Sequence, residues 1–284
     1  MNKYWRYYNH AAVPNTAPNE VPDLLPIING DIWKYNTKIL FAKWTSNFDL
    51  KIETPWWFCI KDTPLNIEDL PAKKRYRITV GLRNFDVHRI AAHEYSNEIY
   101  HIYNEAFASY PNQNRKTFGY EDIYNMIQSW DIKNVVYGAF HKETETLAGI
   151  LLMTERLKCI DLTSQKAIPK YEKYQVNAAL LYRALIDYQD EIQKGRFICD
   201  GERNISHITK FQDYLENLFG FRKAYCVLHI VYRPIMRPII KILYPFKKWL
   251  RTFDRVPFVH NILSVIKLEE IRRQFTSKYS TAGL

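Results

Sequence analysis

The fold is decided between Asn134 and Tyr232, and this stretch begins Val135-Val-Tyr-Gly-Ala-Phe140-His-Lys-Glu-Thr-Glu-Thr146-Leu147-Ala-Gly-Ile-Leu-Leu-Met153. Two runs of strand-forming residues flank a short charged connector, a pattern that predicts a β-hairpin. The run Lys158-Cys-Ile-Asp-Leu-Thr163 follows after a short spacer and predicts a third strand. The stretch therefore opens with a three-stranded meander.

Helical and strand patterns alternate through the rest of this stretch. Apolar residues between Val176 and Asp187 recur at helical spacing. The strand-like run Arg196-Phe-Ile-Cys-Asp200 follows, and a second helical pattern ends at Gly220. Lys223 to Tyr232 predicts a last, long strand. The predicted order is hairpin, strand, helix, strand, helix, strand.

The alternation extends upstream, with a predicted strand at Phe85–Ile90 and predicted helices at Glu94–Ser109 and Tyr120–Trp130. This order, with the pair Gly220-Phe221 between the last helix and the last strand, resembles the GNAT acyltransferase fold. The resemblance covers about half the chain, from Phe85 to Tyr232. It implies an α+β fold in which a mixed sheet is flanked by helices. The alternative interpretation of each strand is an ordinary α/β core.

The part before Phe85 predicts a partial second GNAT-like subdomain. Strand candidates are Ile39–Trp44 and Trp56–Lys61, while residues 1–36 hold closely spaced prolines and predict an irregular segment. A basic helix is expected from Leu70 to a stop at Gly81. It resembles the linking helix of FemABX-type acyltransferases, although an exposed helix with solvated charges is an equal alternative. Its basic cluster consists of Lys73, Lys74, Arg75 and Arg77.

The part after Tyr232 is a distinct tail. Residues 234–253 mix basic and large apolar residues at helical spacing, and a final helix is expected over Phe258–Phe275. Such a basic amphipathic segment can contact a membrane surface, or pack against the body of the protein. We therefore expect three parts, namely the subdomain and linking helix at 1–84, the GNAT-like domain at 85–232 and the helical tail at 233–284.

Composition sets broad limits on function. A hydrophobic content of 47%, with 15% aromatic residues, is that of a globular protein. The net charge of +10 predicts an acidic partner, whether nucleic acid, an anionic membrane or a phosphate-bearing substrate. No apolar run approaches the ~20 residues of a membrane span. The four cysteines lie far apart in apolar runs and predict buried thiols, so we expect a cytoplasmic protein, with membrane association through residues 234–253 as an option.

Sequence motifs exclude several kinds of catalytic site. No phosphate-binding P-loop, no zinc-ligand spacing and no Ser-centred nucleophile elbow occur, and no metal is expected. The GNAT resemblance implies instead an acyl-CoA co-substrate, held where the fourth and fifth strands part. The donor's pyrophosphate would rest on backbone N–H groups where the next helix begins. The residues expected to bind the donor are Ser164, Gln165, Lys166 and Ala167, and then Gln175, Val176, Asn177 and Ala178.

The helix start departs from the family pattern Arg/Gln-x-x-Gly-x-Gly/Ala. Gln175 and Asn177 stand where small residues are expected. Asn tolerates a left-handed backbone better than most residues, so Asn177 is a partial substitute for glycine and Gln175 is not. Glu216 stands where many relatives have a Tyr that serves as general acid, with Tyr214 on another face of the helix. The alternative donor is aminoacyl-tRNA, which FemABX-type relatives use without depending on this loop.

The expected general base is Asp200, because it ends an apolar strand and partial burial would raise its pKa. Asn204 is a second catalytic candidate, with helix capping as its equal alternative, and Tyr174 is a third. Asp161 is a further candidate for the base if it faces the cleft. The sequence thus predicts an N-acyltransferase acting on an amine such as an amino sugar or another cell-envelope precursor. A GNAT-shaped scaffold without activity, which would bind a partner or RNA, is the competing class.

Overall fold

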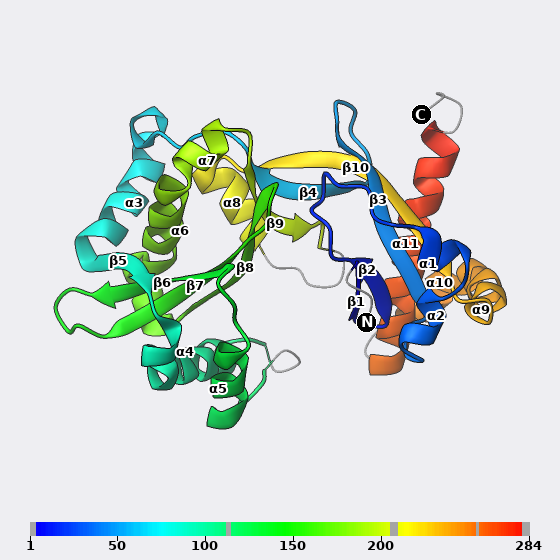
Figure 1. Ribbon diagram of the computed structural model, residues 1–284, viewed down its shortest axis with the longest axis horizontal. Coiled ribbons are helices and arrows are strands. Elements are labelled where there is room, and N and C mark those ends of the chain that lie inside the picture. The colour runs from blue at the N-terminus through cyan, green and yellow to red at the C-terminus, as the bar shows by residue number, and fades with distance from the viewer. Residues whose placement is uncertain (1–3, 112–114, 205–209, 254–255, 280–284) are drawn as a thin grey trace. The chain divides into compact units, whose positions relative to one another are not determined.

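The computed structural model describes residues 4–111, 115–204, 210–253 and 256–279 (Figure 1). Contacts group the chain into two compact units. Unit 1 comprises Met1–Cys59, Glu202–Lys210 and Lys223–Leu284, and unit 2 comprises Ile60–Gly201 and Phe211–Arg222. These boundaries differ from those of the three expected parts, because the chain passes from one unit to the other several times.

Unit 2 is built on a sheet with the strand order β5-β6-β7-β8-β9. Adjacent strands pair antiparallel from β5 to β8, whereas β9 is parallel to β8. The predicted hairpin and meander are thus confirmed. Strand β8 continues to Ala167, beyond its predicted end at Thr163. The bounds are Phe85–Ile90 (β5), Asn134–His141 (β6), Leu147–Glu155 (β7), Cys159–Ala167 (β8) and Phe197–Glu202 (β9).

Helices cover both faces of this sheet (Figure 1). Successive side chains of β8 point to opposite faces of the sheet, so two neighbouring residues show which helices lie on which face. Lys166 donates to the hydroxyl of Tyr110, which follows α4, whereas Gln165 donates to Asn177 in α6. The helices are α3 (Ala72–Asn84), α6 (Val176–Asp187), α7 (Gln189–Gln193) and α8 (Phe211–Phe219) on the α6 face, and α4 (Ser96–Ala108) and α5 (Tyr120–Gln128) on the other.

Helix α3 runs through Gly81, where the sequence predicted a stop, and ends at Asn84. The glycine serves a close approach between helices instead. A Cβ atom at this position would lie 2.8 Å from the carbonyl oxygen of Gln175 and 3.1 Å from the Cβ of Ala179. Only a residue without a side chain lets α3 pack this closely on the start of α6.

Unit 1 contains the antiparallel pair β1 (Trp5–Tyr8) and β2 (Ala11–Pro14), followed by β3 (Phe41–Leu50) and β10 (Arg222–Tyr232). Strand β2 is parallel to β3, and β3 pairs antiparallel with β10. The prediction that residues 1–36 are irregular was wrong, because short elements accommodate the prolines at their ends: β2 ends at Pro14, and Pro26 lies in the first turn of α1. Unit 1 also contains α1 (Leu25–Ile28), α2 (Ile32–Tyr35), most of β4 (Trp56–Lys61) and the helical tail, and its core includes Trp5, Ala12, Ile32, Ile39 and Ala42.

The tail is helical, as expected, and its long last helix α11 spans Pro257–Tyr279. No helix in the described part of the chain is long and apolar enough to cross a membrane. The elements before α11 are α9 (Met236–Leu243), η5 (Tyr244–Phe246), α10 (Lys247–Leu250) and η6 (Arg251–Phe253).

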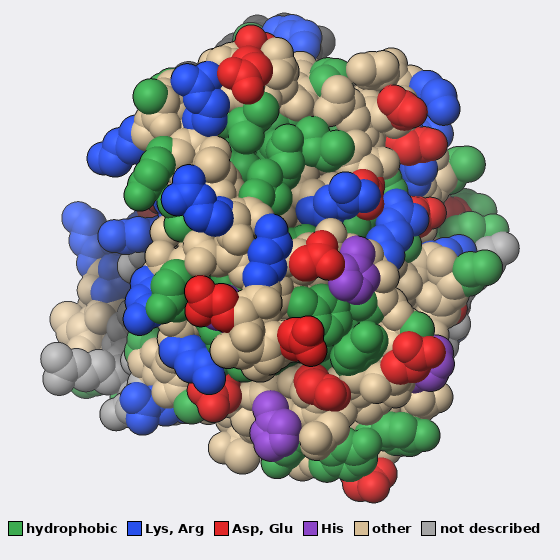
Figure 2. All heavy atoms as spheres, turned by 90° about the vertical axis from the view of Figure 1, so that its left-hand side faces the viewer, with side chains coloured by type: hydrophobic (Ala, Val, Ile, Leu, Met, Phe, Trp, Pro, Cys, Tyr) green, Lys and Arg blue, Asp and Glu red, His purple; other side chains and the backbone are tan. Residues whose placement is uncertain are grey.

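The positive charge of the chain does not form one continuous patch on the face drawn in Figure 2. This face shows Lys and Arg side chains interspersed with Asp, Glu and His among the residues drawn in colour. An acidic partner that binds this face would therefore be recognised by a local arrangement of cations.

Candidate active site

Strands β8 and β9, the last two strands in the order given for unit 2, pair over a short length and then part. They pair through Cys159 with Phe197, Ile160 with Ile198 and Asp161 with Cys199. Beyond these pairs β8 continues to Ala167 alongside β7, and β9 continues past Cys199. Parallel strands that part leave backbone N–H and C=O groups available on the edges that face each other. The opening expected between the fourth and fifth strands therefore begins at Asp161 and Cys199.

Asp200 is the first residue of β9 beyond the paired segment. Its side chain is half-buried, and burial raises the pKa of its carboxyl group to about 7. A hydrogen bond with the side chain of Gln212, in α8, partly offsets this effect. A carboxylate with a pKa near 7 can accept a proton at neutral pH and is a stronger base than an exposed one. The geometry thus supports the expected base at the position where the strands part.

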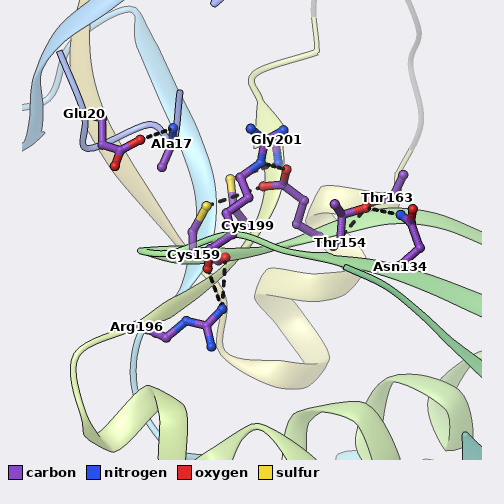
Figure 3. Close-up of polar contacts among 11 residues, drawn as sticks. Ala17, Glu20, Asn134, Thr154, Cys159, Thr163, Arg196, Cys199 and Gly201 are labelled. Carbon is purple, nitrogen blue, oxygen red and sulfur yellow. Dashed lines mark hydrogen bonds and ion pairs between the residues drawn. The ribbon is translucent and has the colours of Figure 1, made fainter. Parts of the chain in front are cut away.

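The residues around the last pair fix the backbone at Asp200 (Figure 3). The N–H of Gly201 donates to Sγ of Cys199 over 3.3 Å, and Gly201 has a φ of +102°, which favours glycine. All four cysteines are buried and free, as expected. Burial raises the pKa of the Cys199 thiol, so it stays protonated and is no nucleophile.

Asp161 differs from Asp200 in having a cationic partner. Its carboxylate is paired with the guanidinium of Arg156, from the turn between β7 and β8. An ion pair of this kind occupies the carboxylate oxygen that would otherwise accept a proton. Of the two aspartates at the parting strands, Asp200 is therefore the better base.

The start of α6 is formed by Gln175, which has a left-handed backbone with φ 63° and ψ 36°. Asn177, the residue expected to be left-handed, is helical instead. Gln175 accepts this conformation because its N–H donates to the carbonyl of Glu172 and its carbonyl accepts from the N–H groups of Ala178 and Ala179. It therefore performs the backbone role that a glycine was expected to have.

Arg77 of α3 lies beside this helix start. Its Nε donates to Oε1 of Gln175 over 3.0 Å, and its guanidinium lies 5.3 Å from the ring centre of Tyr214 in α8. A guanidinium at a helix N-terminus adds positive charge where the helix dipole already favours anions. Sequence reasoning placed Arg77 in a basic cluster but missed this position, because nothing local links α3 to α6.

The predicted donor-binding residues of β8 divide between the two faces of the sheet. Gln165 donates from Nε2 to the Oδ1 and the carbonyl of Asn177, at 2.8 and 3.2 Å, and so faces α6. Ser164 bonds to the hydroxyl of Tyr103, on the α4 side, as Lys166 does to Tyr110. The structure thus brings Gln165 together with Asn177 and leads the side chains of Ser164 and Lys166 away from them.

The remaining predicted residues lie in varied surroundings. Ala167, Val176 and Ala178 are buried, and a Cβ atom on Gly149 would lie 3.0 Å from that of Ala167. Tyr174 ends the 3₁₀ helix η4 (Pro169–Tyr174), and its ring centre lies 5.7 Å from that of His141 in β6. Its catalytic role stays a prediction.

Asn204, the second catalytic candidate, is exposed. The described part of α8 begins at Phe211, and residues 205–209, where a helix capped by Asn204 would begin, lie outside the described chain. Both alternatives for Asn204, a role in catalysis and a role as a helix cap, stay predictions.

Comparison with known proteins identifies the fold. A scan against protein-family models gave no match, and neither did a search of curated proteins. FemX is similar in structure over 78% of both chains, with a TM-score of 0.50 and 10% sequence identity. The fold is GNAT-like, with FemABX features.

Two further solved structures match a similar share of this chain. A conserved protein of unknown function from Bacteroides thetaiotaomicron matches over 78% of both chains, with a TM-score of 0.50 and 9% identity. A tandem GNAT protein from the clavulanic acid biosynthesis pathway matches over 78% of this chain and 75% of its own, with a TM-score of 0.42 and 10% identity. At such low identities a structural likeness shows the fold alone and leaves the reaction to the chemistry of the site.

Proposed function

We propose that this protein is an N-acyltransferase that moves an acyl group from the thioester of an acyl-CoA to an amine. The observation that carries the proposal is the place of Asp200, at the point where β8 and β9 part, with a pKa of about 7. A carboxylate with this pKa suits the reaction because the attacking nitrogen must lose a proton near neutral pH.

The reaction would proceed by direct attack. The amine nitrogen forms a bond to the acyl carbon, and the carbonyl oxygen takes up the electron pair as an oxyanion. Asp200 accepts the proton that the nitrogen loses, directly or through water. Backbone N–H groups on the edge of β8 beyond Asp161 would stabilise the oxyanion. The C–S bond then breaks, and the thiolate leaves and takes a proton from solvent or a nearby acid.

The start of α6 supports a phosphate-bearing donor. The helix dipole and the Arg77 guanidinium both favour an anion at this position. We assign the donor's pyrophosphate to Gln175, Val176, Asn177 and Ala178 on this basis. Arg77 would then exchange its hydrogen bond with Gln175 for a charge-assisted one with phosphate.

An aminoacyl-tRNA donor is the second candidate, and one observation favours it. The side chains of Gln175 and Asn177 stand at the helix start in place of small residues, and each is held by a hydrogen bond, to Arg77 and to Gln165. They leave less room for a pyrophosphate than glycines would. FemABX-type enzymes, which share this fold, take their acyl group from aminoacyl-tRNA and do not depend on this loop.

The acceptor that we propose is an amine on an amino sugar or another cell-envelope precursor. The net charge of +10 supports it, because phosphate-linked or membrane-held acceptors carry negative charge. A cytoplasmic location agrees with this acceptor and with the four free cysteines. A scaffold that lacks catalysis and binds RNA or a protein partner is the competing proposal.

The test is binding and turnover of both donors. Calorimetric titrations would use acetyl-CoA, a longer acyl-CoA and an aminoacyl-tRNA, and turnover would be followed as amine-dependent release of free thiol or tRNA. Binding of an acyl-CoA with thiol release that Asp200→Asn abolishes supports the first proposal. Salt-sensitive binding of aminoacyl-tRNA alone supports the second. Binding of neither donor would overturn both and leave the scaffold.

A further inference from the structure

The tail segment before α11 has apolar side chains on two sides. Ile240 and Leu250 are turned inward, with exposed fractions of 4% and 8%. Seven other large apolar residues are turned outward, each exposed by 40–68%. This exposed stripe consists of Ile235, Ile239, Ile242, Phe246, Trp249, Phe253 and Val256.

The exposed stripe follows a helical period along its whole length. Successive members are separated alternately by four and three residues, the spacing that places side chains on one face of a helix. The elements α9, η5, α10 and η6 follow one another without a break from Met236 to Phe253. The rings of Trp249 and Phe253 touch edge to face, 5.0 Å apart. A continuous apolar face of this kind is uncommon on a soluble protein and indicates an interaction surface.

The charge around the stripe indicates what covers it. Residues 233–253 contain six Lys and Arg and no Asp or Glu. Lys247 and Arg251 pair with Glu270 of α11, whereas Lys241 and Lys248 are exposed. Cations that flank an apolar face complement a surface that is apolar inside and negatively charged outside. A bilayer with anionic headgroups has this structure.

We propose that the exposed stripe binds the surface of an anionic lipid bilayer, with α9 and α10 lying in the plane of the interface. Its aliphatic and Phe side chains would enter the boundary between headgroups and acyl chains, and Trp249 would lie at headgroup depth. Lys241 and Lys248 would contact lipid phosphates. The proposal is independent of the proposed reaction, although a membrane-held acceptor would bring the two together.

Vesicle sedimentation with the full chain tests the proposal. Vesicles of phosphatidylcholine alone are compared with vesicles that contain about one third phosphatidylglycerol, at low and high salt. We expect binding to the anionic vesicles only, weakened by salt, with a blue shift of Trp249 fluorescence that Trp249→Phe removes. The double variant Phe246→Ser/Trp249→Ser should bind about tenfold more weakly or not at all, because it deletes two exposed rings that the bilayer would bury.

Matched variants separate the stripe from general surface effects. Leu157→Ser, at an 86% exposed residue of unit 2, should bind vesicles as the unmodified chain does. Lys241→Glu/Lys248→Glu should lose binding, and Lys194→Glu, also at an exposed residue, should lose little. Circular dichroism melts check that every variant is folded. Equal vesicle binding by the stripe variants would overturn the proposal. So would lipid-independent self-association in the ultracentrifuge that the stripe variants abolish, which would assign the stripe to a second copy.

Discussion

Arg77 donates a hydrogen bond to Gln175 across 3.0 Å and thereby joins the linking helix α3 to the residue where α6 begins. The two residues are 98 positions apart in sequence. Gln175 has a left-handed backbone that few residues with side chains adopt, and Arg77 holds its side-chain amide. Together they put a fixed cation at the helix start that we assign to the acyl donor.

Removal of this cation should weaken donor binding. We expect Arg77→Ala to lower the affinity for acyl-CoA by about tenfold, because one charge-assisted hydrogen bond to phosphate is lost, and Arg77→Lys to have an intermediate effect. Calorimetric titration measures the change. Arg83→Ala, at an exposed arginine in the same helix, is the control. If both alanine variants bind the donor as the unmodified chain does, the donor does not use this helix start.

The close packing of α3 on α6 predicts a strong effect at Gly81. We expect Gly81→Ala to lower the free energy of unfolding by about 1–3 kcal/mol, because the new methyl group would meet the backbone oxygen of Gln175 at 2.8 Å. Urea denaturation measures this, with Thr79→Ala at an exposed position of α3 as the control. A stabilised Gly81→Ala would show that helix propensity outweighs the packing and that the two helices can separate.

Asp200 should cost stability at neutral and alkaline pH. Its folded pKa is raised from 3.8 to about 7, so the fold favours the protonated form and the cost develops as the pH rises through this range. The shift corresponds to at most about 4 kcal/mol, which solvent at the half-buried carboxyl reduces to about 1–2 kcal/mol. We therefore expect Asp200→Asn to raise the free energy of unfolding at pH 8 and to leave it nearly unchanged near pH 4. Equal effects at both pH values would show that the carboxyl is not perturbed.

Glu269 of α11 should show the opposite pH dependence. Burial alone would raise its pKa, but hydrogen bonds from Arg272 and Arg273 outweigh burial and lower the pKa below 4.5. A lowered folded pKa contributes stability above the unfolded value, and this stability is lost as the pH falls through the folded pKa.

We expect Glu269→Gln to lower the free energy of unfolding at pH 7 by about 1–3 kcal/mol, with a difference that shrinks below about pH 4. Thermal denaturation across this pH range measures the change. The exposed ion pair of Arg75 with Glu68 offers the control. Glu68→Gln should change the free energy of unfolding by less than about 1 kcal/mol. A constant loss at all pH values would mean that Glu269 acts by shape and not by charge.

The sequence predicted the strands and helices of unit 2 well, because their apolar runs are long and separated by clear turns. Strand β5 and the helix start at Tyr120 agree with the prediction to the residue. The failures have a common cause. Gly81 was predicted to end a helix, and Gln175 was predicted to be unable to replace a glycine. Both predictions rested only on the conformational preference of the single residue. The contact between the two, across α3 and α6, overrides it.

The residues of the candidate site could be predicted only where a local feature of the sequence marks them. Asp200 could be named because it directly follows the apolar run Phe197-Ile-Cys199. The contact of Arg77 with Gln175 and the ion pair of Asp161 with Arg156 could not be predicted, because each depends on the direction in which a side chain points from its element. The short strands at Trp5–Tyr8 and Ala11–Pro14 were missed because four-residue elements leave too little periodic pattern.

The rate of acyl transfer as a function of pH tests the central claim most directly. With an acyl-CoA donor and an amine acceptor whose own pKa is well below 7, the account predicts that kcat/KM rises with pH and levels off above about pH 7, as Asp200 loses its proton. In Asp200→Asn this rise should disappear and the rate should fall by about 10²–10⁴-fold while donor affinity is kept. A variant with the same rate and the same pH profile as the unmodified chain would contradict the claim that Asp200 is the base.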